Sequence, residues 1–259
     1  MIVWPVLIFV LGLAIGSFLN VVIFRLAKGK SFLKGRSYCP KCKHQLGAKD
    51  LIPLFSFIFQ KSRCRYCKKK ISSLYPLVEL AAGLTFLLVY FNFGLSLKSL
   101  VYIIYSCFLI IIFVYDLRHH LILDKVTIPA IIIAFLASFF LKVSFFSILF
   151  GAIIGGGFFF IQFAASRGKW IGGGDIRLGV LMGLILGWEK LIVALVIAYL
   201  SGALVALMFL ITKKKGLKSK LPFGTFLSLG TFVTLLYGSQ MIDWYLSGAL
   251  VNWYLYREY

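Results

Sequence analysis

The stretch VYIIYSCFLIIIFVYD, residues 101–116, decides the fold. Fifteen residues without a charged side chain are followed at once by an aspartate, Asp116. Long uninterrupted apolar runs favour helices that cross the bilayer, which need about 20 residues, whereas a membrane β-barrel shows short segments of alternating polarity. Similar runs recur along the chain, and 61% of its 259 residues are hydrophobic. The sequence therefore predicts an all-α membrane protein, a polytopic bundle of transmembrane helices.

Eight membrane spans are predicted outward from this stretch. The sixth is short and contains glycine, which favours a helix packed inside the bundle, and the amphipathic tail 240–259 is expected to lie in the interface or to belong to a ninth span. No internal repeat is visible. The predicted spans are residues 2–24, 74–92, 99–115, 125–141, 145–165, 176–188, 190–211 and 223–239.

The distribution of basic residues predicts the orientation. The net charge is +20, and 24 of the 28 Lys and Arg residues fall in segments 25–73, 116–125, 166–177 and 212–222. Basic residues gather in cytoplasmic loops, so these segments are expected inside and the N-terminus outside. The same rule explains the charge without nucleic acid, for which no binding motif is present. We expect a multi-pass membrane protein that contacts membrane lipid and no nucleic acid.

Two C-x-x-C pairs, Cys39 with Cys42 and Cys64 with Cys67, lie in the one sizeable polar stretch between spans. Four thiolates at this spacing are typical of a tetrahedral zinc site with no open position for water, which makes the metal structural. Disulfides rarely persist in the cytoplasm, where the charge pattern places this stretch. We therefore predict three parts: residues 1–26 as the first helix, 27–73 as a cytoplasmic zinc module and 74–259 as a membrane core with its tail.

Ionisable side chains inside membrane spans are expensive and usually functional. Asp116 closes the third predicted span, and Asp175 follows three glycines and opens the sixth, so the topology predicts both near the cytoplasmic surface. Two carboxylates at one depth can share a proton, one acting as general base on water and the other polarising a carbonyl. The glycines are expected to allow close backbone approach and conformations that a Cβ forbids. The pair therefore favours an aspartic peptidase.

Structural alternatives exist for each acid. Asp175 has the position of a helix cap, and Asp116 could form an ion pair with Arg118, His120 or Lys125. Asp124 is a lower-ranked catalytic candidate, because a role as helix N-cap explains it fully. Neither an H-E-x-x-H nor a G-x-S-x-G motif is present, so the zinc-protease and serine-hydrolase classes are excluded.

An ordered set of motifs resembles the type IV prepilin peptidases, also called leader peptidase/N-methyltransferases, over nearly the whole chain. One position departs from the family's pattern, since Leu123 stands where a proline usually precedes the second aspartate of the first motif, here Asp124. The matching elements are GSFLNVVIFRL at 16–26, the two cysteine pairs, DLIPLFS at 50–56, YPLVEL at 75–80, Gly172, Gly174 and Asp175, and KLPFG at 220–224.

The resemblance implies that Asp116 and Asp175 are the catalytic aspartates of an eight-helix bundle. It implies substrates that are type IV prepilins or pseudopilins, cleaved after a leader glycine at the cytoplasmic face. It also implies N-methylation of the new N-terminus with S-adenosylmethionine, for which Glu79 is the sharpest polar candidate. A structural acid paired with a lysine or arginine is the alternative role for Glu79.

Two other functions stay open at this point. A presenilin-like protease shares the arrangement of Tyr115-Asp116 and the Gly-x-Gly-Asp element, although it would not account for the cysteine pairs. A transporter or assembly factor with a zinc module would use the aspartates for ion or proton transfer.

Overall fold

A computed structural model describes residues 3–31, 35–212 and 221–256 of the chain, and side chains as far as residue 247. Parts of three predicted segments lie outside the described residues. They are the first residue of the first span, most of the basic segment 212–222 including Lys220, and the last three residues of the tail. The described residues are helical with no β-strand, only two isolated bridges. The predicted all-α class is confirmed.

Six helices are long and apolar enough to cross a membrane. Large apolar side chains stand exposed on their outer faces, as expected where lipid replaces water as the solvent. The helix α5 (Asp124–Phe140) is shorter, at 17 residues. The six are α1 (Val3–Leu26), α3 (Leu74–Phe93), α4 (Leu97–His119), α6 (Phe145–Ser166), α7 (Gly173–Ile211) and the part of α8 (Phe223–Tyr256) up to Ser247.

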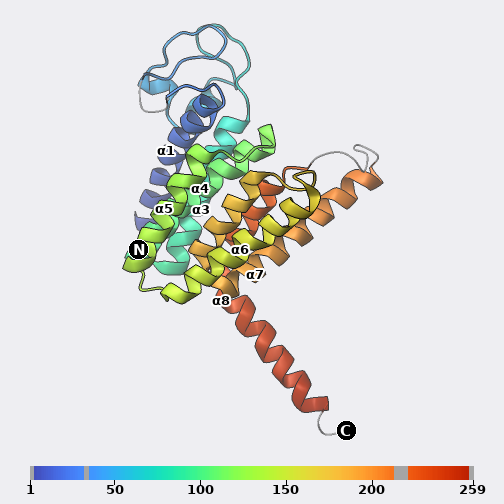
Figure 1. Cartoon of the computed structure of the whole chain (residues 1–259). Coiled ribbons are helices and arrows are strands. Elements are labelled where there is room, and N and C mark those ends of the chain that lie inside the picture. The colour runs from blue at the N-terminus through green and yellow to red at the C-terminus, as the bar shows by residue number, and fades with distance from the viewer. Residues whose placement is uncertain (1–2, 32–34, 213–220, 257–259) are drawn as a thin grey trace. The chain divides into compact units, whose positions relative to one another are not determined.

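The chain divides into two compact units, and residues 1–114 form the first. In it α1 packs along α3, because glycines remove the side chains between them (Figure 1). A Cβ at Gly12 would lie 2.7 Å from the Cα of Gly83, and one at Gly16 would lie 2.7 Å from the Cα of Glu79. Small residues that let helix backbones approach are the usual device for packing helices in a membrane.

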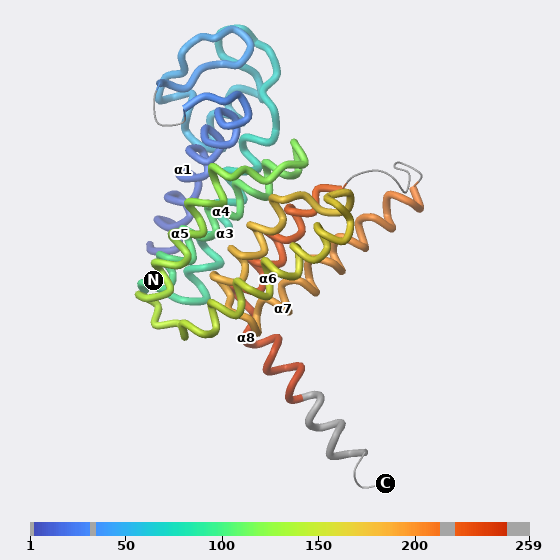
Figure 2. The backbone as a smooth tube through the Cα atoms, viewed as in Figure 1, coloured from blue at the N-terminus to red at the C-terminus, as the bar shows by residue number. Residues whose placement is uncertain are grey.

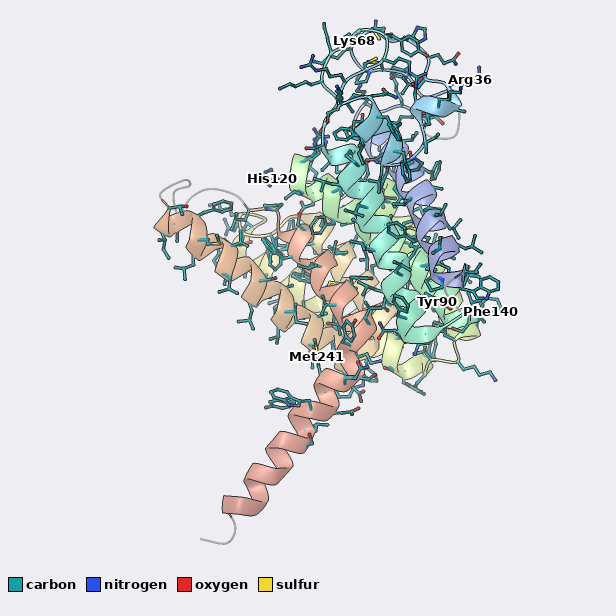
Figure 3. The ribbon with its side chains drawn as sticks, turned by 180° about the vertical axis from the view of Figure 1, so that it is seen from behind. Arg36, Lys68, Tyr90, His120, Phe140 and Met241 are labelled. Atoms are coloured by element: carbon teal, nitrogen blue, oxygen red, sulfur yellow. The ribbon has the colours of Figure 1, made fainter. Side chains whose placement is uncertain are left out.

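The polar stretch of the first unit lies at one end of this helix pair and contains the 3-10 turn η1 (Ala48–Asp50) and the short helix α2 (Phe55–Phe59). Figure 3 labels Arg36 and Lys68 at this end and Tyr90 toward the opposite end of α3. The unit is therefore polar and basic at one end and apolar along its length.

Residues 115–259 form the second unit, in which α7 packs against α5, α6 and α8. The contact between α6 and α7 uses a Gly-x-x-x-Gly pair on each helix: Gly151 and Gly155 face Gly183 and Gly179. A Cβ at any of these four positions would collide with the facing backbone. This close contact fixes α7, which supplies one of the two aspartates.

The helix α7 covers the sixth and seventh predicted spans, and a break inside it lies close to the predicted boundary between them. Gly187 has φ 74° and ψ 173°, a conformation that favours glycine, and it separates two helical halves (Figure 2). The predicted tail 240–259 continues α8 as a helix to Tyr256.

The third predicted span ends later than expected. Asp116 does not close α4; the helix runs three residues further, to His119, with Arg118 and His119 in its last turn. Basic side chains there are favoured by the partial negative charge of the helix C-terminus. The aspartate therefore belongs to a helix, which restricts the direction of its side chain.

Candidate functional site

Asp116 is buried, with 4% of its surface exposed, and its carboxylate is bound by the start of another helix. Its Oδ2 accepts hydrogen bonds from the backbone N–H of Thr225, at 2.8 Å, and from the Thr225 hydroxyl, at 3.2 Å. Thr225 is the third residue of α8, where unpaired N–H groups and the helix dipole favour an anion. The carboxylate is therefore held by Thr225, and His120, one of the partners that the structural alternative named, also acts on it electrostatically.

Asp175 lies in the first turn of α7, as predicted. Its Oδ2 accepts a hydrogen bond of 3.0 Å from the N–H of Gly172, the residue that precedes the helix. This is the capping role that the structural alternative expected. Asp116 nevertheless lies close enough to act electrostatically on Asp175. The two predicted residues are therefore brought together. Asp116 lies in the last turn of α4 with its carboxylate at the N-terminus of α8, and Asp175 lies in the first turn of α7.

One side chain, Ile122, joins the two aspartate positions. It belongs to the short turn between α4 and α5, two residues after His120, which Figure 3 labels. A Cβ at Gly174 would lie 2.8 Å from the Cβ of Ile122, and a Cβ at Gly224 would lie 2.9 Å from its Cδ1 and 3.1 Å from Asp116 Oδ2. Ile122 thus fills the space that both glycines leave open.

The three glycines before Asp175 differ in their roles. None of them has a positive φ, so the expectation that they adopt conformations forbidden to other residues is wrong. Gly174 is required by its contact with Ile122, whereas a Cβ at Gly173 would meet nothing within 4 Å. The glycine requirement at Gly174 comes from packing against Ile122.

Asp124 forms an ion pair with Arg177 and is the first residue of α5, one position after the helix cap Leu123. The expected N-cap role is therefore replaced by an ion pair that links the N-termini of α5 and α7. Both side chains are exposed by 40% or more, and exposed ion pairs contribute only about 0–1 kcal/mol.

The four predicted metal ligands, Cys39, Cys42, Cys64 and Cys67, form one cluster. Their sulfur atoms all lie within 4.8 Å of one another, and the Sγ atoms of Cys39 and Cys67 are 3.9 Å apart. Tetrahedral zinc with Zn–S bonds of about 2.3 Å needs sulfur atoms about 3.8 Å apart. All four are free thiols, so the cluster can hold a metal ion.

The two cysteine pairs are built alike, although no repeat was expected from the sequence. The N–H of Cys39 bonds the carbonyl of His44, and the N–H of Cys64 bonds that of Lys69, both at 2.9 Å. Lys43 and Lys68 follow the pairs with φ of 60° and 57°. These are two copies of one knuckle, 25 residues apart, and the shared C-x-x-C-Lys pattern was the available signal.

The pKa values of the Cys39 and Cys42 thiols are shifted in opposite directions. Burial opposes ionisation of Cys39, but backbone and thiol hydrogen bonds outweigh it and lower its pKa to about 7. The pKa of Cys42 is raised to about 11: a backbone hydrogen bond at His44 favours its thiolate, and desolvation together with the neighbouring thiols prevails. Thiolates this close to one another repel as like charges, and a metal cation that binds them removes this repulsion.

Asp50 ties the two knuckles together. Its carboxylate accepts hydrogen bonds from the Gly47 N–H and the Gln60 amide, both at 3.1 Å, and pairs with Arg65 at 3.2 Å. It also accepts a hydrogen bond from Tyr66, and it raises the pKa of that hydroxyl as a smaller contribution beside desolvation. Asp50 is therefore committed to the internal structure of the module.

Glu79, the candidate for methyl transfer, is buried in α3 with 8% of its surface exposed. Its Oε2 accepts a hydrogen bond of 2.9 Å from the N–H of Leu54, and Ser17 also bonds it. Leu54 has φ 60°, which is strained for a leucine. Glu79 therefore connects three of the motifs that carry the family resemblance, because its partners Leu54 and Ser17 belong to the other two.

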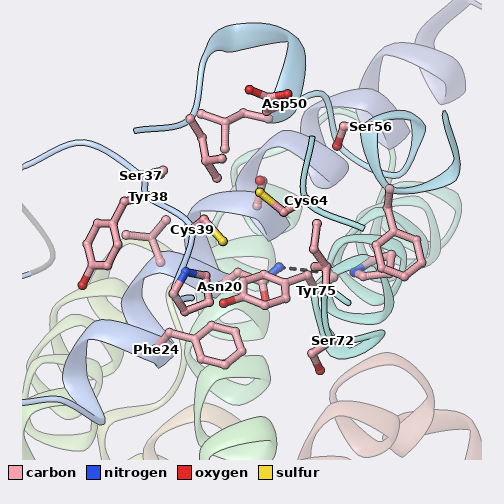
Figure 4. Close-up of a pocket in the computed structure, with 18 of the residues that line it drawn as sticks. Asn20, Phe24, Ser37, Tyr38, Cys39, Asp50, Ser56, Cys64, Ser72 and Tyr75 are labelled. Atoms are coloured by element: carbon pink, nitrogen blue, oxygen red, sulfur yellow. Dashed lines mark hydrogen bonds between the residues drawn. The ribbon is translucent and has the colours of Figure 1, made fainter. Parts of the chain in front are cut away.

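Glu79 also lines a cavity of about 550 Å³ between α1, the cysteine module and α3 (Figure 4).

The sequence did not predict the roles of three residues around the two sites: Thr225, Ile122 and Leu54. Thr225 directly follows the KLPFG motif, so its place was the available signal. The roles of Ile122 and Leu54 depend on long-range contacts that no local pattern indicates.

Comparison with known proteins agrees with this arrangement. The model of the bacterial peptidase A24 N-terminal domain matches residues 10–93, and that of the type IV leader peptidase family matches residues 103–207. A prepilin leader peptidase/N-methyltransferase of Bacillus subtilis is 33% identical, over 94% of this chain and 98% of the relative. Proteins of the same name from Stutzerimonas stutzeri and Aeromonas salmonicida are each 31% identical, over 93% and 94% of both chains respectively.

No solved structure matches the chain. The relatives are covered along almost their full length at more than 30% identity. The two family models together include Glu79, the cysteine pairs, Asp116 and Asp175. This multi-pass membrane protein belongs to the prepilin leader peptidase/N-methyltransferase family.

Proposed function

We propose that this chain removes the leader of type IV prepilins or pseudopilins at the cytoplasmic membrane face and then methylates the new N-terminus. The observation that carries the peptidase proposal is the juxtaposition of two carboxylates in the second unit, that of Asp116 at the N-terminus of α8 and that of Asp175 at the N-terminus of α7, with Ile122 packed against both helix starts. The relatives' printed names supply the substrate class and the second activity. A substrate with a polar leader and an apolar helix suits a site at the end of membrane helices.

The two aspartates act as a pair on one water molecule. Carboxylates near one another are not readily both ionised, so one retains a proton. Asp116, which accepts two hydrogen bonds from Thr225, is the ionised base that takes a proton from water. Asp175 donates its proton in a hydrogen bond to the scissile carbonyl. The water oxygen attacks the carbonyl carbon as the proton of Asp175 passes to the carbonyl oxygen. The C–N bond then breaks as Asp116 gives its new proton to the peptide nitrogen, which leaves as the new amine, and a hydroxyl proton of the intermediate returns to Asp175.

The cysteine cluster binds one structural zinc ion through Cys39, Cys42, Cys64 and Cys67. The sulfur spacing supports this assignment, and four protein ligands leave no position for a reacting water. The zinc joins two knuckles that also meet through Asp50 and through the rings of His44 and Tyr66, whose centroids are 3.6 Å apart.

Glu79 serves the methyl transfer. S-adenosylmethionine supplies a methyl group on a positively charged sulfur. The substrate's N-terminal ammonium must lose a proton before its nitrogen can form the new bond, and Glu79 is the carboxylate placed to accept it. The Leu54 N–H and Ser17 hold that carboxylate in one orientation at the cavity wall.

The experiment is a reconstitution of the purified chain in lipid with a prepilin from the same genome. Leader removal is followed by the size of the product, and methylation by the mass of its N-terminal peptide with and without S-adenosylmethionine. We expect a shortened product that gains the mass of one methyl group when the donor is present. An uncleaved prepilin would contradict the peptidase proposal, and a cleaved product without the gain would contradict the methyl transfer.

A further inference from the structure

The cavity of the first unit has properties of a ligand site. Its volume of about 550 Å³ lies within the roughly 300–1,000 Å³ that small-molecule sites occupy. Its lining combines two acids, two amides, aromatic rings and several lysines (Figure 4). All of these residues belong to the unit 1–114.

Asn20 is the most informative residue in that lining. It comes from α1 and is buried, with 2% of its surface exposed. Its Nδ2 donates a hydrogen bond of 2.9 Å to the carbonyl of Tyr75, which fixes the orientation of the amide. Its Oδ1 is buried without a hydrogen-bond partner. An unpaired buried acceptor costs about 1–3 kcal/mol, so a ligand donor that reaches Oδ1 recovers that cost.

Two aromatic rings stand beside this amide. Phe24 and Tyr75 are stacked with ring centroids 4.4 Å apart and an angle of 17° between their planes, and both line the cavity. Flat aromatic walls bind the faces of nucleobases by stacking, at about 1–3 kcal/mol per base. Asn20 beside these rings supplies the acceptor that an adenine amino group or a ribose hydroxyl requires.

We infer that this cavity binds S-adenosylmethionine, with the nucleoside against Phe24 and Tyr75 and a nucleoside donor on Asn20 Oδ1. Glu79, in the same lining, compensates the positive charge of the methionine part of the donor. The inference rests on the methyl transfer proposed above and names its site. The transfer forms a C–N bond on the substrate amine and breaks the methyl–sulfur bond, whose electron pair stays on sulfur; the amine's proton passes to Glu79.

The test is the binding of radiolabelled S-adenosylmethionine to the purified full-length chain in detergent, by equilibrium dialysis. Asn20→Leu removes the acceptor at similar volume. Val21→Phe narrows the cavity from the next residue of α1 without removing a polar group, so it covers the case in which Asn20→Leu unfolds the protein. Val10→Phe is the matched control: it makes the same change on the same helix, where the side chain is 54% exposed.

We expect both cavity variants to bind the donor at least about tenfold more weakly, which corresponds to about 1.4 kcal/mol, and the control to bind like the wild type. Unlabelled S-adenosylhomocysteine should displace the label from the wild type. Thermal unfolding of each variant reports whether it is folded.

Two results would overturn the assignment in distinguishable ways. If the wild type binds the donor and methylates its product, and folded Asn20→Leu and Val21→Phe proteins bind it equally well, the cavity is the wrong site and the methyl transfer stands. If the wild type neither binds the donor nor methylates a cleaved product, the proposed methyltransferase function and the cavity assignment both fail.

Discussion

Asp116 is the residue on which the chemistry of the second unit depends most. Its carboxylate is buried at the end of one helix and bonded by the start of another, so its position is set by contacts 109 residues apart in sequence. The Thr225 hydroxyl adds a hydrogen bond that the backbone N–H alone does not provide. Thr225 is therefore a positioning residue for the proposed base.

We predict that Thr225→Val lowers the rate of leader cleavage by roughly tenfold or more, because a hydrogen bond to a charged group contributes about 1.5–3 kcal/mol. Thr225→Ser, which keeps the hydroxyl, should restore most of the rate. The measurement is the cleavage rate of a prepilin in membranes. Thr231→Val is the matched control, since the Thr231 hydroxyl bonds a carbonyl of its own helix, that of Leu227. Equal rates for the Val and Ser variants would contradict the role.

The residue identities of the site were largely predictable, and their environments were not. Acids are so rare in this chain that Asp116 and Asp175 stood out by composition alone. The partner of Asp116 could not be predicted, because it depends on where α8 begins in space. Glu79 was found as a candidate, but its bond to Leu54 depends on a strained backbone that sequence does not indicate.

At the scale of elements, the start of α7 illustrates how a motif encodes packing. The turn between α4 and α5 places Ile122 against Gly174 and Gly224. Gly174 directly precedes Asp175, and Gly224 directly precedes Thr225, which bonds Asp116. A side chain at Gly174 would push α7 away from the turn. The glycine before it, Gly173, has open space beside it.

We predict that Gly174→Ala reduces leader cleavage by at least about tenfold, since a displacement of about 1 Å in a catalytic group is enough to cost that much. Gly173→Ala is the control and should cleave at nearly the wild-type rate. Combining Gly174→Ala with Ile122→Ala frees the colliding volume and should recover part of the loss. Cleavage in membranes measures all three. A severe defect in Gly173→Ala, or no recovery in the double variant, would show that packing against Ile122 is not the reason for the glycine.

The cysteine module offers a prediction on metal content. Purified protein should hold about one zinc ion per chain, and Cys42→Ser should lose most of it, because structural sites need all four ligands. Cys107→Ser is the matched control, since Cys107 lies in α4 outside the cluster. Elemental analysis by mass spectrometry measures the ratio. A zinc-free wild type, or zinc retained in full by Cys42→Ser, would contradict the assignment.

At the scale of the whole molecule, α6 gives the orientation its clearest test. It has 22 residues, so it is about 33 Å long, close to the roughly 30 Å of a bilayer core. The turns that precede and follow it contain Lys142 and Arg167, which have similar backbone conformations, with φ of 53° and 50°. The charge pattern predicts Lys142 outside and Arg167 inside.

We predict that a cysteine placed at Lys142 reacts with a membrane-impermeant maleimide in intact cells, and that one placed at Arg167 reacts only in inverted vesicles. The two sites serve as controls for each other. Labelling of both from the same side would show that α6 does not cross the membrane, and the reverse pattern would overturn the predicted orientation.

The fold class was predictable because apolar runs and charge asymmetry are strong signals in a membrane protein. Helix ends were less so, since α4 extends through Asp116, although the break at Gly187 lies close to the predicted boundary between the sixth and seventh spans. The Gly-x-x-x-Gly spacing of Gly151 and Gly155 is a local signal for close helix packing, but the sequence does not indicate which helix they pack against.

The central claim is that Asp116 and Asp175 together perform the cleavage. The most direct measurement is the rate of leader removal by Asp116→Asn and Asp175→Asn proteins in membranes, with folding checked by thermal unfolding. Asn keeps the size of the side chain and removes its acid–base function, so each variant should lose at least about 100-fold in rate. The account would be contradicted by a folded variant of either aspartate that still removes the leader at close to the wild-type rate.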